Sequence, residues 1–452
     1  MISRKYTVWV FLAGWVLLSG CPAIHRARDA QNPKKTPPGE RTVTAEEAGI
    51  AADSTITLDR AIEIATNYHP SAVQARQNVE IARVQYRNAV SGYLTSAQTS
   101  AGYSRGTSNV APNKPTNRAQ DNYSANLGLN MTVFDFGKTP ALVRQANANK
   151  IASEKSLESA INDLTYQVTV AYYGLIQAQS LLTVAMDQER DFRVHLEQVQ
   201  ALFEVGRNIK LDVTKAGVDW NNSKLSLLIA QNGVLNTRAT LNQAMGLAEC
   251  PVYQVTEPPV DDYNPNLDNL MAATREKNPQ LLALLAQEQA ASAGIDASVA
   301  ALFPWVSLSA GKTWSGTNFP LIWNWSYGAS LNWNPFDAFR NYNLIDRSSA
   351  ELRSARAARA AFEQQLYQTL SNAIALFQHA RERMIVADLL VEQARENLEL
   401  YKERFRVGRA SAVELTDAEV SLTSARSGQV QARYDYHTAL AQIRHTVGGE
   451  LP

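Results

Sequence analysis

Cys21 is the residue of this chain best placed for covalent chemistry, and it is one of only two cysteines among 452 residues. Arg4 and Lys5 precede an apolar run over residues 6–18 that is too short to span a bilayer, and two small residues separate the run from the cysteine. This pattern predicts an export signal over residues 1–20 that is removed, leaving Cys21 as an acylated first residue. An ordinary signal peptide with a chance cysteine is the alternative.

The residue after Cys21 indicates which of the two bacterial membranes holds the lipid anchor. Pro22 stands where an aspartate is associated with inner-membrane retention, which favours the outer membrane. Once Cys21 carries lipid, Cys250 has no partner, so we expect no intramolecular disulfide.

The other reactive residue types form no recognisable site. The six histidines show no pair at metal-ligand spacing, and the sequence contains no phosphate-binding glycine loop and no nucleophile elbow. We therefore expect no enzyme activity, no cofactor and no metal. Lys plus Arg number 43 and Asp plus Glu number 43, so the formal charge of zero favours neither nucleic acid nor an acidic surface as partner.

The sequence contains two copies of one pattern of predicted helices and strands. Self-similarity of this kind predicts a tandem duplication, with repeats over residues 57–246 and 267–452 joined by a connector over residues 247–266. Residues 21–56 are predicted to form an extended tether. The matching segments are Tyr68-His69-Pro70 with Lys277-Asn278-Pro279, Phe134-Asp135 with Phe336-Asp337, Phe203-Glu204-Val205-Gly206-Arg207 with Phe405-Arg406-Val407-Gly408-Arg409, and Met245-Gly246 with Val447-Gly448.

Apolar residues recur in alternating steps of four and three, which is the period of a coiled coil. A helix over residues 138–203 would reach roughly 100 Å at 1.5 Å per residue. A cytosolic coiled-coil rod would explain this pattern equally well. The predicted seam consists of Leu157, Ile161, Leu164, Val168, Ala171, Leu175, Ala178, Leu182, Ala185, Phe192, Leu196, Val199 and Phe203, and then of Leu366, Leu370, Ala373, Phe377, Ala380, Met384, Ala387, Val391, Ala394, Leu398, Tyr401 and Phe405.

The segments between the helices alternate apolar and small polar residues, which predicts strands with one apolar face. Residues 123–133 and 324–334 show this alternation, with weaker partner strands over 97–103 and 306–312. No apolar stretch of about 18 residues is expected after the export signal, so an outer-membrane β-barrel with aromatic girdles is the way left to cross lipid. Soluble hairpins packed on a helical core are the alternative.

Four strands cannot close a barrel around a channel, so several chains must contribute to one barrel. Three copies would supply twelve strands and an open lumen, whereas two copies would leave the interior filled by side chains. A homotrimer is the simplest solution.

The chain from about Thr57 to its C-terminus resembles the TolC-like outer-membrane efflux proteins, within them the lipid-anchored branch. The resemblance rests on the helix starts at Pro70 and Pro279, the repeated Phe-Asp element, and the turns at Gly206 and Gly408. It implies a mostly α fold, with a long coiled-coil α-barrel in the periplasm and four strands per chain in a trimeric twelve-stranded β-barrel. It also implies an exit duct of a tripartite efflux or type I secretion system, with a periplasmic adaptor and an inner-membrane pump as partners.

The resemblance further implies roles for two groups of residues. The helix turns would be periplasmic tips where an adaptor docks, and carboxylates just beyond them would ring the constricted end of the tunnel. Glu414 is alternatively only the partner of Ser411 in a capping box, which the first tip lacks at Ile209. The tip residues are Val205, Gly206, Arg207, Val407, Gly408 and Arg409, and the aperture residues are Asp212, Glu414, Asp417 and Phe405.

The sequence departs from the gating pattern of the family at the tips. Phe405 and Ala410 replace a tyrosine and an arginine that can bond across the tip. We therefore expect closure to depend on packing by Phe203 and Phe405 more than on ion pairs. A lipid-anchored coiled-coil scaffold without a pore is the remaining alternative function, and the transported substrate cannot be read from the sequence.

Overall fold

The computed structural model describes residues 54–107, 119–257 and 263–449, together with residues 27, 30, 31, 37, 41, 43–50 and 451. The predicted export signal and Cys21 lie outside these residues. The chain divides into two compact units, one from residues 1–74, 160–265 and 372–445, the other from residues 75–159, 266–371 and 446–452. Each unit takes segments from both predicted repeats.

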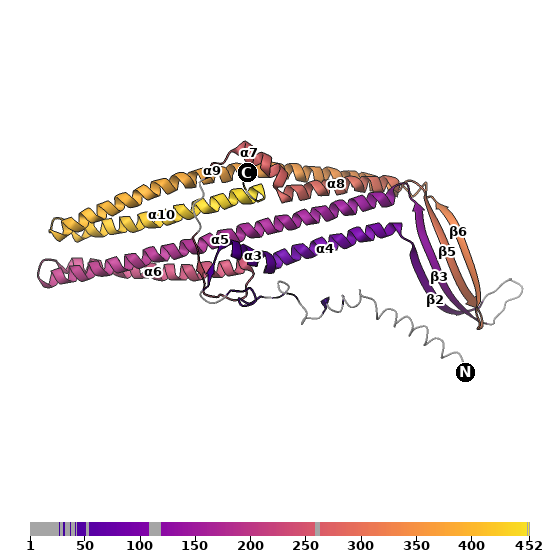
Figure 1. The fold of residues 1–452 in the computed structure, drawn as a ribbon, viewed down its shortest axis with the longest axis horizontal. Coiled ribbons are helices and arrows are strands. Elements are labelled where there is room, and N and C mark those ends of the chain that lie inside the picture. Colours follow the sequence, from indigo (N-terminus) through magenta and orange to yellow (C-terminus); the bar gives the residue numbers. More distant parts are fainter. Residues whose placement is uncertain are drawn as a thin grey trace. The chain divides into compact units, whose positions relative to one another are not determined.

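Each repeat contributes one helix of 67 residues followed by one of 36 residues, as the repeated pattern predicts. They are α5 (Lys138–Glu204) and α6 (Lys210–Met245) in the first repeat, and α9 (Arg340–Arg406) and α10 (Ala412–Val447) in the second. Figure 1 shows α6 alongside α5 and α10 alongside α9. The helix predicted over residues 138–203 is confirmed to within one residue.

The residues of the predicted coiled-coil seam are buried or half-buried on α5 and α9, with one exception. On α5 the buried seam residues include Leu164, Val168 and Leu175, and on α9 they include Leu370 and Phe377. Phe203 is the exception, because its side chain is 39% exposed at the last turn of α5. The expected packing by Phe203 is therefore not present in the single chain.

Four strands form one antiparallel sheet in the order β2-β3-β5-β6. Their bounds are β2 (Ser96–Gly106), β3 (Gln120–Phe134), β5 (Trp305–Gly316) and β6 (Ile322–Asn332). The two predicted hairpins thus join through β3 and β5, and Figure 1 shows the curved sheet that results. The partner strands β2 and β5 extend further toward their hairpin loops than the sequence predicted.

Shorter helices begin each repeat, and proline separates them as expected. α3 (Leu58–Tyr68) precedes α4 (Pro70–Val90), and α7 (Leu267–Lys277) precedes α8 (Pro279–Ala300). The side chain of Asn278 accepts a bond from the backbone N–H of Leu281 and so caps α8.

One glycine in each repeat packs against the break between these short helices. Gly246 has φ 79°, and a Cβ added to it would lie 2.9 Å from the Cα of His69. Gly448 has φ 95°, and its Cβ would lie 2.9 Å from the Cα of Asn278. The duplicated Met-Gly and Val-Gly elements therefore serve the same close backbone contact in the two repeats.

Gly246→Ala is expected to destabilise the protein markedly. The left-handed backbone costs a non-glycine residue about 1–2 kcal/mol, and the new Cβ would overlap backbone atoms of His69 that no rotamer change can move. Gly206→Ala is the matched control, because Gly206 has φ 75° with open space around its Cβ position. Thermal unfolding followed by circular dichroism should show a larger loss for Gly246→Ala, and equal losses would contradict the packing role.

The last part of the predicted tether is packed rather than extended. Val43, Ala48 and Ile50 are buried in the same core cluster as Tyr172 of α5. The strand β1 (Thr55–Ile56) pairs in parallel with β4 (Gln254–Val255) of the connector. The apolar residues near the end of this segment explain the difference, because they bury surface against the helices.

One helix contains an apolar stretch of the length needed to cross a membrane, which was not expected from the sequence. An 18-residue window of α5 is long and apolar enough to cross a membrane, and half of that window is buried. The expectation that no such stretch follows the export signal is therefore wrong. Leu164, Val168 and Leu175 of α5 belong to the packed core, which accounts for the apolar character without a membrane.

Candidate functional site

The first predicted tip is a tight reversal between α5 and α6. Gly206 adopts φ 75°, and the N–H of Arg207 donates to the carbonyl of Leu202 at 2.8 Å, which ends the helix as a Schellman turn. Val205 is 70% exposed beside this glycine. Ile209 occupies the cap position of α6, and its side chain makes no capping bond.

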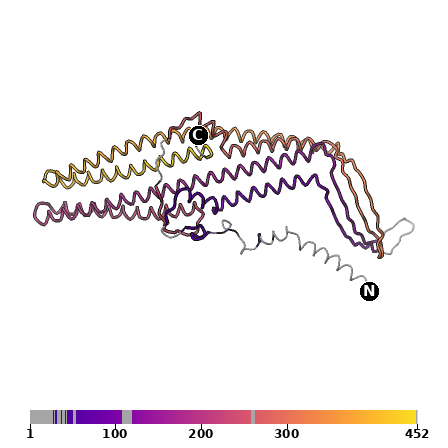
Figure 2. The backbone as a smooth tube through the Cα atoms, in the orientation of Figure 1, coloured from indigo at the N-terminus to yellow at the C-terminus, as the bar shows by residue number. Residues whose placement is uncertain are grey.

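The second predicted tip repeats the reversal between α9 and α10. Gly408 adopts φ 72°, and the N–H of Arg409 donates to the carbonyl of Arg404 at 2.8 Å. Val407 is 62% exposed in the position that corresponds to the valine of the first tip. Both reversals lie at the same end of their compact unit (Figure 2).

A complete capping box distinguishes the second tip from the first, as the sequence predicted. The N–H of Ser411 donates to Glu414 Oε2 at 2.7 Å, and the N–H of Glu414 donates to Ser411 Oγ at 3.2 Å. The bond from the Ser411 backbone and the bond from its hydroxyl lower the pKa of Glu414. Glu414 therefore caps α10, which was the alternative to its predicted role at the aperture.

Ser411→Ala is expected to weaken the first turn of α10 by about 1 kcal/mol, because it removes an N-cap. Amide hydrogen exchange should become faster in that turn. Ile209→Ser supplies the reciprocal test at the first tip, where a new hydroxyl cap should slow exchange in the first turn of α6. Unchanged exchange in both variants would show that the caps do not set the rigidity of the tips.

The predicted aperture carboxylates lie in the first turns of the returning helices. Glu414 and Asp417 are exposed on α10, and Asp212 is half-buried on α6. Ser421 Oγ donates to the backbone carbonyl of Asp417 at 2.8 Å and does not engage its carboxylate. The first two carboxylates stand three residues apart, and this spacing places them on one face of a helix.

Phe405 packs at the second tip as expected. Its half-buried ring lies against the apolar cluster that includes Leu398, Leu415 and Ala418. The ring centroid is also 6.0 Å from that of His195, which is buried on α5. Phe405 thus links the two helical hairpins, and Phe203 does not share this role.

Glu419, a buried carboxylate near the tips, was not identified from the sequence. Glu419 of α10 is only 7% exposed, and its Oε2 has no hydrogen-bond partner within the described part of the chain. The pKa of Glu419 is raised to about 7, mainly because the carboxyl is buried; Lys402 lowers this pKa, and Asp191 and Asp219 contribute to raising it. Its place among the apolar residues Leu415, Ala418 and Leu422, which recur in steps of three and four, was the available sequence signal.

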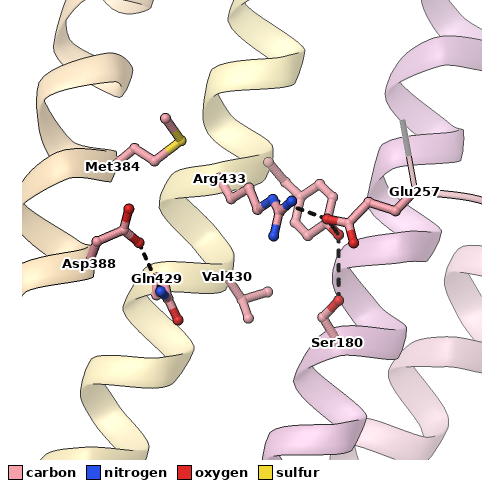
Figure 3. Close-up of a pocket in the computed structure, with 8 residues that line it drawn as sticks. Ser180, Glu257, Met384, Asp388, Gln429, Val430 and Arg433 are labelled. Carbon is pink, nitrogen blue, oxygen red and sulfur yellow. Dashed lines mark hydrogen bonds and ion pairs between the residues drawn. The ribbon is translucent and has the colours of Figure 1, made fainter. Parts of the chain in front are cut away.

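A cavity of about 380 Å³ lies in the same unit, between α5, α9 and α10 and further from the tips than Glu419 (Figure 3). Arg433 and Tyr434 both bond to Glu257, at 3.0 and 3.1 Å. Gln429 donates to Asp388 at 2.8 Å. Each charged group that lines the cavity thus has a polar partner within the protein, and the arrangement serves packing between helices.

Comparison with known proteins decides the family. The model of the outer membrane efflux protein family matches residues 61–247 and 270–449, close to the two predicted repeats. The chain is an outer membrane efflux protein. The resemblance drawn from the Pro, Phe-Asp and Gly elements is confirmed.

This outer membrane efflux protein is similar over most of its length to outer membrane proteins of other bacteria. It is 23% identical to outer membrane efflux protein BepC of Brucella suis, over 82% of this chain and 79% of BepC. It is 22% identical to the probable outer membrane lipoprotein SilC of Salmonella typhimurium, over 87% of this chain and 86% of SilC. The solved structure of the outer membrane protein VceC of Vibrio cholerae matches with a TM-score of 0.77 at 18% identity, over 87% and 97% of the two chains.

These matches confirm the fold predicted from the sequence, which combines long helices with a four-stranded membrane sheet. The predicted location in the outer membrane and the efflux function follow from family membership. The family consists of channel proteins, so a cytosolic rod is excluded for this outer membrane efflux protein.

Proposed function

We propose that this outer membrane efflux protein is a homotrimeric exit duct, which receives substrates from an inner-membrane pump and a periplasmic adaptor. It would serve a tripartite efflux or a type I secretion system. The observation that carries the proposal is that α6 and α9 have exposed apolar faces, and that β2 and β6 have unpaired edges, to which another copy of the chain could bind.

α6 has an apolar face opposite the one that it buries. Ala216 and Ser223 are buried, whereas Val218 and Leu225 are 54% and 58% exposed. A step of two residues turns about 200° around a helix, so the exposed pair points away from the core. Ile229, 65% exposed, continues this face.

α9 repeats this arrangement at the other helical edge. Ala387 and Leu398 are buried, whereas Leu389 and Leu400, two residues further on, are 54% and 59% exposed. Exposed apolar surface of this extent marks an interaction site. Packing α6 of one copy on α9 of the next would cover both faces and close a ring.

The sheet supports the same assembly. Among the strands that the structure describes, β2 and β6 each pair on one side only. Unpaired strand edges cannot face lipid, so β2 of one copy would pair with β6 of the next. Three copies give twelve strands around a lumen.

The tips support the docking of an adaptor. Val205 and Val407 are exposed apolar side chains beside the glycine reversals, and Arg207 and Arg409 add a cation to each tip. Together with Gly206 and Gly408, these residues would receive the helical hairpins of the adaptor, in the helix-in-groove manner of recognition. The inner-membrane pump would bind at the same end.

The aperture follows from threefold symmetry. Glu414 and Asp417 would place six carboxylates around one opening, with Asp212 beside them and Phe405 packing the hairpins together. A ring of carboxylates favours cations and resists anions. Acylated Cys21 would anchor the chain in the outer membrane, and the protein would have no catalytic role.

The test is the migration of the purified protein on mild-detergent gels. A trimer that requires detergent and that dissociates only on heating would support the duct, because a barrel shared by three chains resists separation. A monomer under both conditions would favour the lipid-anchored scaffold without a pore. Mass by light scattering distinguishes three copies from two.

A further inference from the structure

Among the described residues of the sheet, the apolar face carries one cation without an ion-pair partner, Lys312. Register pairs Leu127 of β3 with Lys312 of β5, and Lys312 with Trp325 of β6. Paired residues point to the same face of a sheet, so Lys312 shares the face of Leu127, Leu129 and Trp325. The inference rests on the proposed duct, in which this apolar face meets lipid.

No carboxylate balances Lys312 among the residues that the structure describes. The other charges on this face, Arg105 and Asp121, lie 3.6 Å apart near the hairpin loop and neutralise each other. Lys312 is exposed and contacts two aromatic rings instead. Its Nζ lies 5.2 Å from the ring centroid of Trp314 and 4.6 Å from that of Trp323.

The two indoles show where the ammonium group is held. Trp314 and Trp323 are a register pair, two residues from Lys312 toward the β5–β6 turn. Tryptophan on the lipid face of a barrel marks the level of the lipid headgroups, and a lysine just inside that level extends toward it. Cation–π contacts with both rings fix the ammonium group in this position.

We propose that Lys312, with Trp314 and Trp323, binds the phosphate of an anionic membrane lipid on the outside of the sheet. The ammonium group has three donors and a full charge, and none of the described carboxylates forms an ion pair with it. The lipid phosphate supplies the missing counter-charge, and the acyl chains lie along the apolar face. The indoles hold the lysine in place and contact the lipid below its headgroup.

Native mass spectrometry of the full-length protein, titrated with phosphatidylglycerol or phosphatidylcholine, tests the site. The protein should retain phosphatidylglycerol preferentially, and Lys312→Gln should reduce that preference about fivefold or more. Lys312→Arg should restore it, and Trp323→Leu should weaken it in a protein that keeps the lysine. Lys277→Gln, which removes a positive charge from an exposed residue of α7, should change nothing.

Three results would overturn the lipid site. These are an unchanged preference in Lys312→Gln and Trp323→Leu, an equal loss in Lys277→Gln, and displacement of the lipid by inorganic phosphate at the same concentration. The same spectra report the number of chains. A protein that stays trimeric without lipid preference refutes this site alone, whereas a protein that is monomeric throughout refutes the proposed duct.

Discussion

Leu225→Glu combined with Ile229→Glu is expected to abolish trimer formation. Both side chains lie on the exposed apolar face of α6, where the proposed ring buries them against α9 of the next copy. Moving an unpaired charge out of water costs several kcal/mol per ion, and a trimer repeats this cost at each of its interfaces. Light scattering of the detergent-solubilised protein should then give the mass of one chain.

The matched control is the pair Ser226→Glu and Gln231→Glu. Both residues are exposed on the same helix but lie off its apolar face, so they add the same charge without entering the proposed interface. This variant should remain trimeric. A trimer in both double variants would contradict the assembly through α6 and α9.

Glu419→Gln is expected to stabilise the tip region at pH 8 and to have no effect at pH 4. Burial raises the pKa of Glu419 from an ordinary 4.5 to about 7, so the folded chain binds this proton more tightly than the unfolded chain. The stability that neutral Glu419 contributes is complete below about pH 4.5 and is lost as pH rises through about 7. The difference corresponds to about 3 kcal/mol.

Glu419 of α10 interacts with charged residues of the other three long helices. Asp191 of α5 and Asp219 of α6 raise its pKa, and Lys402 of α9 lowers it. Ionisation of Glu419 should therefore loosen α10 from its neighbours near the tips. Limited proteolysis should cut the tips of the unmodified protein faster at pH 8 than at pH 5.

Glu414→Gln provides a control of opposite sign. The pKa of Glu414 is lowered by its bonds from Ser411, so its contribution is present at neutral pH and is lost as pH falls through its folded-state pKa. Thermal midpoints measured from pH 4 to pH 8 should separate the two variants. A difference between Glu419→Gln and the unmodified protein that is the same at both ends of this range would contradict a raised pKa.

Periodicity made much of the fold predictable. Steps of four and three residues gave the long helices and their buried seam, because a helix that packs along one stripe must repeat its apolar residues. Alternation gave β3 and β6, whose apolar and polar faces differ clearly. The ends of β2 and β5 were missed because Arg105 and Lys312 place charges at positions of the apolar face, and pairing with a neighbouring strand extends β2 and β5 beyond the predicted ends.

The surroundings of individual polar residues were less predictable. The capping box of Ser411 and Glu414 is local, so sequence spacing was sufficient to find it. The burial of Glu419 depends on three other helices that are distant in sequence, and its neighbours could not be named from spacing alone. Phe203 and Phe405 occupy matching positions, yet only Phe405 has a ring partner on the other hairpin.

The most direct test of the duct is single-channel conductance of the purified protein in planar bilayers at neutral pH, with and without Glu414→Gln and Asp417→Asn. We expect cation-selective openings whose selectivity falls when these carboxylates are neutralised, because the ring of charge is lost. The absence of conductance, even after Phe405→Ala has loosened the packing at the tip, would contradict a pore and favour the scaffold.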